Sequence, residues 1–308
     1  MSNWGKGHEN NSIGWGQGGV NNSIGWGSVY DRSASGQTLL NPIPSDDFII
    51  EVNTALAGVS ASNQFQFTGA IGEYDVKAYQ NGSLVASFND LINEETITLP
   101  SQGIYELRVI IKEAGFDKME FNDGGDRLKL LKILNWGSYG VNEPNQSNAF
   151  RGCENNTEIA GNGAWFDVVT NGGSMFRDNS LTSLPSDMHF PLMTLATSMF
   201  FNNNLISLPL GMNLPLLTLA VSMFRNNNLT SLPVGMKLPL LENGNRMLEG
   251  NTINTERYSQ LLIDLEANNN NNNVGFHGGN SKYNSQGEIA RNALIARGWT
   301  IIDGGFEN

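Results

Sequence analysis

A repeat of 24 residues in the second half of the chain limits most strongly what this sequence can fold into. Its clearest copies run from Ser-Met-Phe to Ser-Leu-Pro and cover residues 174–185, 198–209 and 222–233. Prolines keep the same interval, and a less regular copy begins at Ala149. Because one such unit cannot bury its apolar face alone, the repeat predicts a solenoid of stacked coils over residues 149–253.

Each repeat predicts one short helix and one short strand. Leu216, Leu219, Ala220 and Met223 lie at i, i+3, i+4 and i+7 after Pro215, which indicates an apolar helix face. The Asn-Leu-Thr-Ser-Leu-Pro segment that follows predicts an extended stretch that ends at proline. Strands of successive coils are expected to form a parallel sheet with a spacing of about 4.8 Å.

Three sets of side chains recur at fixed places in the coils. We expect the phenylalanines and asparagines to form internal ladders in which the amides hydrogen-bond backbone groups, and Cys153 to fill the asparagine place of the first coil as a packed thiol. A third column varies from coil to coil and is the candidate ligand surface, with an ordinary solvated face as the alternative. The ladder residues are Phe176, Phe200, Phe224, Asn179, Asn203 and Asn227, and the variable residues are Arg177, Phe201, Arg225 and Glu249.

The repeats resemble the BspA-type leucine-rich repeats. The resemblance rests on Ser-Met-Phe-Arg-Asn-Asn-Asn-Leu-Thr-Ser-Leu-Pro (222–233) and on Ala-Phe-Arg-Gly-Cys (149–153), and it covers residues 149–253. It implies an α/β solenoid that works by binding. The chain departs from the pattern at Phe201, where the other copies have arginine.

Residues 45–115 predict a small all-β sandwich. Six short segments rich in Ile, Val, Phe, Tyr and Thr are separated by Gly, Asn, Asp or Pro, and Gln80-Asn81-Gly82-Ser83 is typical of a hairpin turn. This region resembles PKD or immunoglobulin-like modules in its order of strands. The tryptophan-aspartate turn of that family is absent here, and Ala78 to Gly82 stand in its place.

Two further regions flank the repeats. Residues 116–148 are expected to form a bridge and N-terminal cap with a strand over 118–121, a turn at 122–125, and a strand or helix over 128–134. Asp123 and Asp126 offer calcium ligation as a weak alternative to a tight turn. Residues 254–308 predict a C-terminal cap of alternating helices and strands, with a capping box at Ser285 and Glu288. Phe-His-Gly-Gly-Asn-Ser-Lys-Tyr-Asn (276–284) and Gly-Trp-Thr-Ile-Ile-Asp-Gly-Gly (298–305) resemble the C-terminal cap of repeat proteins encoded by bacteriophages and of related bacterial surface proteins.

Residues 1–44 form a Gly/Asn-rich arm with tryptophan at intervals of eleven residues. Trp4, Trp15 and Trp26 are large amphipathic anchors, together with Ile13 and Ile24, and the arm lacks enough aliphatic residues for a core of its own. We expect a neighbouring protein to bury these rings, with packing onto the chain's own sandwich as the alternative. The arm resembles the N-termini of phage structural and tail proteins.

Composition excludes several classes of function. The net charge of -12 and the lack of a basic cluster argue against nucleic acid and anionic membranes as partners. No segment approaches the roughly 20 apolar residues of a membrane span, and the first residues lack the pattern of a signal peptide. The sequence shows no combination of a nucleophile, a histidine and a carboxylate in a catalytic pattern. Cys153 and the histidines at 8, 189 and 277 stand far apart. We therefore expect no enzymatic activity, no cofactor and no metal centre.

Two functions remain. The first is a bacteriophage virion protein (fibre, spike or decoration) at the virion surface. Its arm would bind other virion proteins, and its repeats would bind a host surface protein or glycan. Such a fibre is expected to be a homo-oligomer, for example a trimer, although no residue pattern indicates the number of subunits. The alternative is a BspA-like adhesin at the bacterial cell surface.

Overall fold

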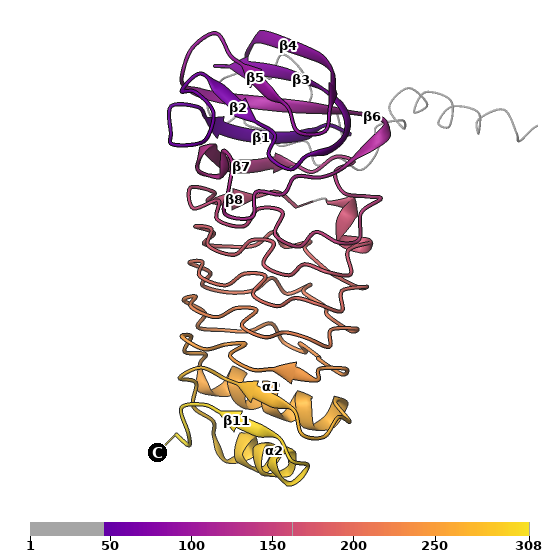
Figure 1. The fold of residues 1–308 in the computed structure, drawn as a ribbon. Helices are drawn as coiled ribbons and strands as arrows, with labels where there is room; N and C mark the ends of the chain where they lie inside the picture. The colour runs from indigo at the N-terminus through magenta and orange to yellow at the C-terminus, as the bar shows by residue number, and fades with distance from the viewer. Residues whose placement is uncertain (1–45, 162, 308) are drawn as a thin grey trace, which may run out of the picture. The chain divides into compact units, whose positions relative to one another are not determined.

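The computed structural model describes residues 46–161 and 163–307, which are mostly β with few helices (Figure 1). The strands are β1 (Phe48–Asn53), β2 (Gln64–Gln66), β3 (Ile71–Gln80), β4 (Ser83–Ile92), β5 (Thr96–Thr98), β6 (Ile104–Lys118), β7 (Leu130–Asn135), β8 (Glu158–Ile159), β9 (Asn243–Gly244), β10 (Gly275–His277) and β11 (Thr300–Ile302). The helices are α1 (Thr255–Asn268) and α2 (Ser285–Ala296), with 3-10 turns η2 (Arg127–Lys129) and η3 (Ala164–Asp167).

All six strands predicted in the first β region are present, as β1 to β6. Asn81 and Gly82 both have positive φ, 52° and 78°, as a two-residue hairpin turn between β3 and β4 requires. The strands form a six-stranded sheet in the order β4-β3-β6-β1-β7-β8 and a two-stranded sheet of β2 and β5. The larger sheet is mixed, because β8 pairs with β7 in parallel while the other pairs are antiparallel.

An aromatic core joins the two sheets. Phe67 follows β2, and its ring lies 5.1 Å from the ring of Tyr74 on β3. Phe48 on β1 lies 4.6 Å from Tyr139, which belongs to the bridging region. Strand β6 also extends to Lys118, across the predicted boundary at residue 115, so the segment predicted as a separate strand over 118–121 only begins in a strand. The bridging region therefore shares its core and its sheet with the first β region.

The repeats form coils that stack at an interval of 24 residues. Parallel bridges join Asn145 to Asn171, then Leu195, Leu219 and Asn243, one residue per coil. Backbone hydrogen bonds run between neighbouring coils, for example from Ala220 N to the Asn243 carbonyl oxygen at 2.9 Å. Figure 1 shows these coils in succession between the sheet region and the C-terminal helices.

The prediction of a short helix in each coil is wrong, because the described residues from 168 to 254 contain no helix. The Ala220 and Ser222 N–H groups donate to the next coil instead of to a carbonyl four residues earlier. Ser222 and Asn226 also have positive φ, 57° and 54°, and would interrupt a helix. The apolar spacing of 3 and 4 residues arose from a tightly turning coil whose interior residues recur at the same interval.

The left-handed positions explain part of the repeat pattern. Two residues with positive φ flank each Met-Phe pair, at Ser174 and Asp178, Ser198 and Asn202, and Ser222 and Asn226. Asn and Asp tolerate this region better than most residues, because their short polar side chains hydrogen-bond locally. In the last coil the second position is Gly250, with φ 84°. These positions are therefore constrained by the backbone.

The C-terminal cap has the predicted order of elements. Helix α1 and helix α2 each precede a strand, and β9, β10 and β11 form a parallel sheet. The predicted capping box is wrong in one detail: the N-cap of α2 is Asn284, whose Oδ1 accepts from the N–H groups of Gln286 and Gly287. Gly298, with φ 84°, follows the helix as expected.

Candidate functional site

The predicted phenylalanine ladder is present inside the stack. The rings of Phe150, Phe176, Phe200 and Phe224 are buried and nearly parallel, and neighbouring centroids lie 5.6, 5.6 and 5.7 Å apart. At this spacing the two inner rings, Phe176 and Phe200, each contact the rings of the coils on both sides. The ladder fixes how the coils stack, and it leaves the residues that follow each ring at the surface.

The predicted asparagine ladder is also present, and it has one more member than the sequence indicated. Asn203 Nδ2 donates to the Phe176 carbonyl oxygen at 2.8 Å, and its Oδ1 accepts from Leu181 N at 3.1 Å. Asn227 makes the same pair of bonds one coil later, to Phe200 and Leu205. Asn251 continues the ladder, since it lies three residues after Leu248, the counterpart of the repeat phenylalanine. Each buried amide therefore satisfies backbone groups of the preceding coil.

The candidate ligand column is present, but its side chains bind one another. The guanidinium carbons of Arg177 and Arg225 lie 4.9 and 5.4 Å from the ring centroid of Phe201. Arg225 pairs with Glu249 at 3.0 Å, and Arg177 pairs with Asp178 at 3.0 Å. These contacts hold the cations and the ring together at the surface, and the remaining guanidinium N–H groups leave the column a candidate ligand surface.

A second exposed surface, which the sequence reasoning missed, follows the extended part of the coils. We call it the polar face and define it by Ser180, Thr182, Asn204, Ile206, Asn228, Thr230, Thr252 and Asn254. Backbone bonds align it, because Ile206 N donates to Thr182 O at 3.3 Å, Thr230 N to Ile206 O at 3.1 Å and Asn254 N to Thr230 O at 2.9 Å. The buried leucines between these residues, Leu181, Leu205 and Leu229, hold the outward residues in register.

The polar face carries no ionisable side chain, although the chain as a whole is acidic. Its hydroxyl and amide groups both donate and accept hydrogen bonds. Ile206, 56 % exposed, lies between Thr182 and Thr230 and adds an apolar patch. A signal was present in the sequence, since Thr182, Ile206 and Thr230 vary within Leu-Thr/Ile-Ser-Leu-Pro. The face could not be recognised until the outward direction of these residues was known.

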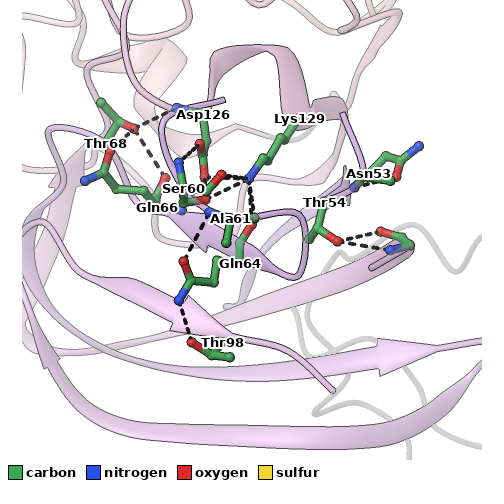
Figure 2. Close-up of polar contacts among 12 residues, drawn as sticks. Asn53, Thr54, Ser60, Ala61, Gln64, Gln66, Thr68, Thr98, Asp126 and Lys129 are labelled. Carbon is green, nitrogen blue, oxygen red and sulfur yellow. Dashed lines mark hydrogen bonds and ion pairs between the residues drawn. The ribbon is translucent and has the colours of Figure 1, made fainter. Parts of the chain in front are cut away.

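The weak calcium alternative at Asp123 and Asp126 is not supported by their contacts. Asp126 is buried and accepts from Ser60 N and Oγ and from Gln66 N, as Figure 2 shows. Lys129, also fully buried, lies 3.4 Å from Asp126 and donates to the Ser60, Ala61 and Gln64 carbonyl oxygens at 2.9 to 3.0 Å. Asp123 pairs with Arg151 at 2.6 Å. A lysine ammonium thus supplies the positive charge beside Asp126.

Two further titratable groups, Cys153 and His189, have pKa values that their surroundings raise. Cys153 is fully buried, and burial raises the pKa of its thiol well above the usual range. His189 Nδ1 contacts the Asp187 carbonyl oxygen, which with the Asp167 carboxylate raises the pKa of the imidazole. The described residues contain no cluster of three or more His, Cys, Asp or Glu that could hold a metal ion.

The tryptophan anchors of the arm, Trp4, Trp15 and Trp26, and the neighbouring Ile13 and Ile24 lie outside the described residues. Among the helices that the structure does describe, none has the length and apolar character needed to cross a membrane.

Comparison of the chain with family models, with curated proteins and with solved structures gives no match in any of the three. A function for this chain is therefore inferred from its own residues and contacts.

Proposed function

We propose that this chain is a non-enzymatic binding protein whose stacked coils present the polar face to a ligand. The observation that carries the proposal is the uncharged, exposed ladder of hydroxyl and amide groups, held in register coil by coil by backbone hydrogen bonds. A rigid, repeated surface of this kind is how solenoid proteins recognise extended partners. Neutral polar groups also lose less free energy than charges when a ligand displaces water.

The fold that we propose for the coils is a leucine-rich-repeat solenoid of the BspA type. The parallel bridges at 24-residue intervals and the buried Leu, Met and Phe of each coil support it. For the first β region we propose a sandwich related to PKD or immunoglobulin-like modules. The packing of Phe67 of the smaller sheet against Tyr74 of the larger one supports that proposal.

The biological setting that we propose is the surface of a bacteriophage virion, with the chain as a fibre, spike or decoration protein. The arm of residues 1–44 would bind other virion proteins through Trp4, Trp15 and Trp26, and the coils would bind a host surface protein or glycan. The eleven-residue tryptophan repeat supports this proposal, because such rings need an apolar partner. A homo-oligomer such as a trimer would multiply weak contacts.

A BspA-like adhesin at a bacterial cell surface is the alternative, since the same coils would serve it. Mass spectrometry of purified virus particles and of bacterial surface fractions distinguishes the two. We expect the protein in particles at a fixed ratio to the capsid protein. Its absence from particles, together with its presence in a bacterial surface fraction, would favour the adhesin.

A further inference from the structure

The polar face ends in a hollow against the C-terminal cap, which we call the terminal hollow. Its volume is about 260 Å³, and it is lined by Ile253 and by the polar residues Thr230, Thr252, Asn254, Thr255, Asn280, Lys282 and Glu307. Cap residues continue the ladder here, since Asn280 N donates to the Asn251 carbonyl oxygen at 2.8 Å and Glu307 N donates to that of Tyr283 at 2.9 Å. Four successive layers of backbone, which contain Thr230, Thr252, Asn280 and Glu307, therefore hold the lining residues.

Most polar groups of the terminal hollow have no partner within the described part of the chain. The side chains of Thr230, Thr252, Asn280, Lys282 and Glu307 make no hydrogen bond or ion pair there. Asn254 is partly used, because its Oδ1 caps α1 and its Nδ2 donates to the Thr230 carbonyl oxygen at 3.1 Å. This contrasts with the arginine column, in which Arg225 is already paired with Glu249.

We propose that the terminal hollow is a binding site for a single ring of a neutral saccharide. One ammonium and one carboxylate line it, so for either an anion or a cation the attraction of one group is offset by the repulsion of the other, whereas a neutral ligand can hydrogen-bond both. Adjacent hydroxyls of a sugar can accept from the ammonium and donate to the carboxylate, and such charge-assisted bonds are the stronger kind. The hydroxyl and amide groups of Thr230, Thr252 and Asn280 complement the remaining hydroxyls.

The size of the terminal hollow fits one ring rather than a large ligand. Its volume of about 260 Å³ lies just below the roughly 300 Å³ at which pockets for drug-sized molecules begin. Because no aromatic residue lines it, no ring stacking adds to the affinity, and we expect a Kd on the order of 1 mM for a free monosaccharide. This inference rests on the proposed function, in which many copies on one particle would convert weak sites into firm attachment.

The test uses the full chain labelled with nitrogen-15 and titrated with D-glucose, D-galactose and N-acetyl-D-glucosamine, with D-glucuronate as the anionic comparison. We expect at least one neutral sugar to shift amide signals of Thr230, Thr252, Asn280 and Lys282, with weaker or no shifts from glucuronate. No shift from any neutral sugar, or stronger binding of glucuronate, overturns the proposal.

Variants locate the site. Lys282→Met and Glu307→Gln should each weaken binding by about tenfold, since each removes one charge-assisted hydrogen bond. Lys237→Met is the matched control, because Lys237 is exposed but does not line the terminal hollow. Sugar-dependent shifts confined to other coils would overturn the terminal hollow as the site and leave glycan recognition by the coils intact. The experiment therefore distinguishes failure of the terminal hollow as the sugar site from failure of glycan recognition by the coils.

Discussion

The phenyl rings of Phe200 and Phe224 stack with their centroids 5.7 Å apart and their planes inclined by only 1°. These two residues are 24 positions apart in the sequence, so the 24-residue repeat places them at equivalent positions of neighbouring coils, where their rings are in contact. The ring of Phe200 also stacks on Phe176 at 5.6 Å. A change at Phe200 therefore disturbs two interfaces between coils at once.

Phe200→Ala should lower the free energy of unfolding by about 3–5 kcal/mol, because it removes a buried ring and leaves a cavity between coils. Since repeat proteins can unfold in parts, hydrogen exchange of residues 174–230 should accompany the denaturant curve. Phe201→Ala is the control: its half-exposed ring contributes a cation–π contact, and the loss should stay below about 1 kcal/mol. Equal losses for the two variants would contradict the ladder as the main stabilising element.

Asn203→Ala tests the amide ladder. The change leaves the Phe176 carbonyl oxygen and the Leu181 N–H without their partner, at a cost of about 1–3 kcal/mol for each buried group. Asn204→Ala changes the neighbouring, exposed asparagine and should be nearly neutral. Chemical denaturation of both variants measures the difference, and a nearly neutral Asn203→Ala would mean that water replaces the amide.

An Arg177→Ala, Phe201→Ala, Arg225→Ala triple variant should keep full binding to sugars or host cells, because none of the three side chains lines the terminal hollow or belongs to the polar face. Its stability should fall modestly, since half-exposed ion pairs contribute about 0–1 kcal/mol each. Isothermal titration or cell-binding assays measure the first effect. A large loss of binding with an intact fold would return the ligand site to this column.

Much of the fold follows from local sequence signals. The strands β1 to β6 were predictable from alternating Ile, Val, Phe and Thr between turn residues, and the turn at Asn81-Gly82 from its need for positive φ. Helix α1 was predictable from apolar periodicity. The coil helices were wrongly predicted because spacing alone cannot show whether Ala220 N bonds within its own coil or, as it does, to Asn243 of the next.

The candidate site was less accessible to sequence reasoning. Variation at Arg177, Phe201 and Arg225 indicated a surface column, but only the folded structure shows that the ring of Phe201 lies near both guanidinium groups. Asp126 was interpreted as part of a tight turn or a weak calcium site, yet its partners Ser60 and Gln66 are some 60 residues away. Pairings of such long range leave no periodic trace in the sequence.

Lys129→Met should lower the free energy of unfolding by about 3–5 kcal/mol, because the buried Asp126 carboxylate loses its cation. Lys132→Met is the control in the same sheet region; the Lys132 side chain is 33 % exposed and its ammonium pairs with Glu51 at 3.4 Å, so the loss should be about 1 kcal/mol or less. Addition of EDTA or of calcium should leave the melting temperature of the natural protein unchanged. A rise with calcium would revive the metal alternative at Asp123 and Asp126.

His189 should give the stability a small dependence on pH. Its hydrogen bonds to the Asp187 carbonyl oxygen and the Asp167 carboxylate raise its pKa in the folded state. A raised pKa means that the protonated form stabilises the fold below the unfolded value of about 6.5, and that this stabilisation is lost as pH rises through the folded pKa. The effect should stay below about 1 kcal/mol, because the His189 and Asp167 side chains are 44 % and 64 % exposed.

His189→Asn is a suitable comparison, since Asn213 occupies the same place in the next coil. Melting temperatures of the two proteins should differ more at about pH 5.5 than at about pH 8.5, and a difference that grows with pH would contradict the assignment.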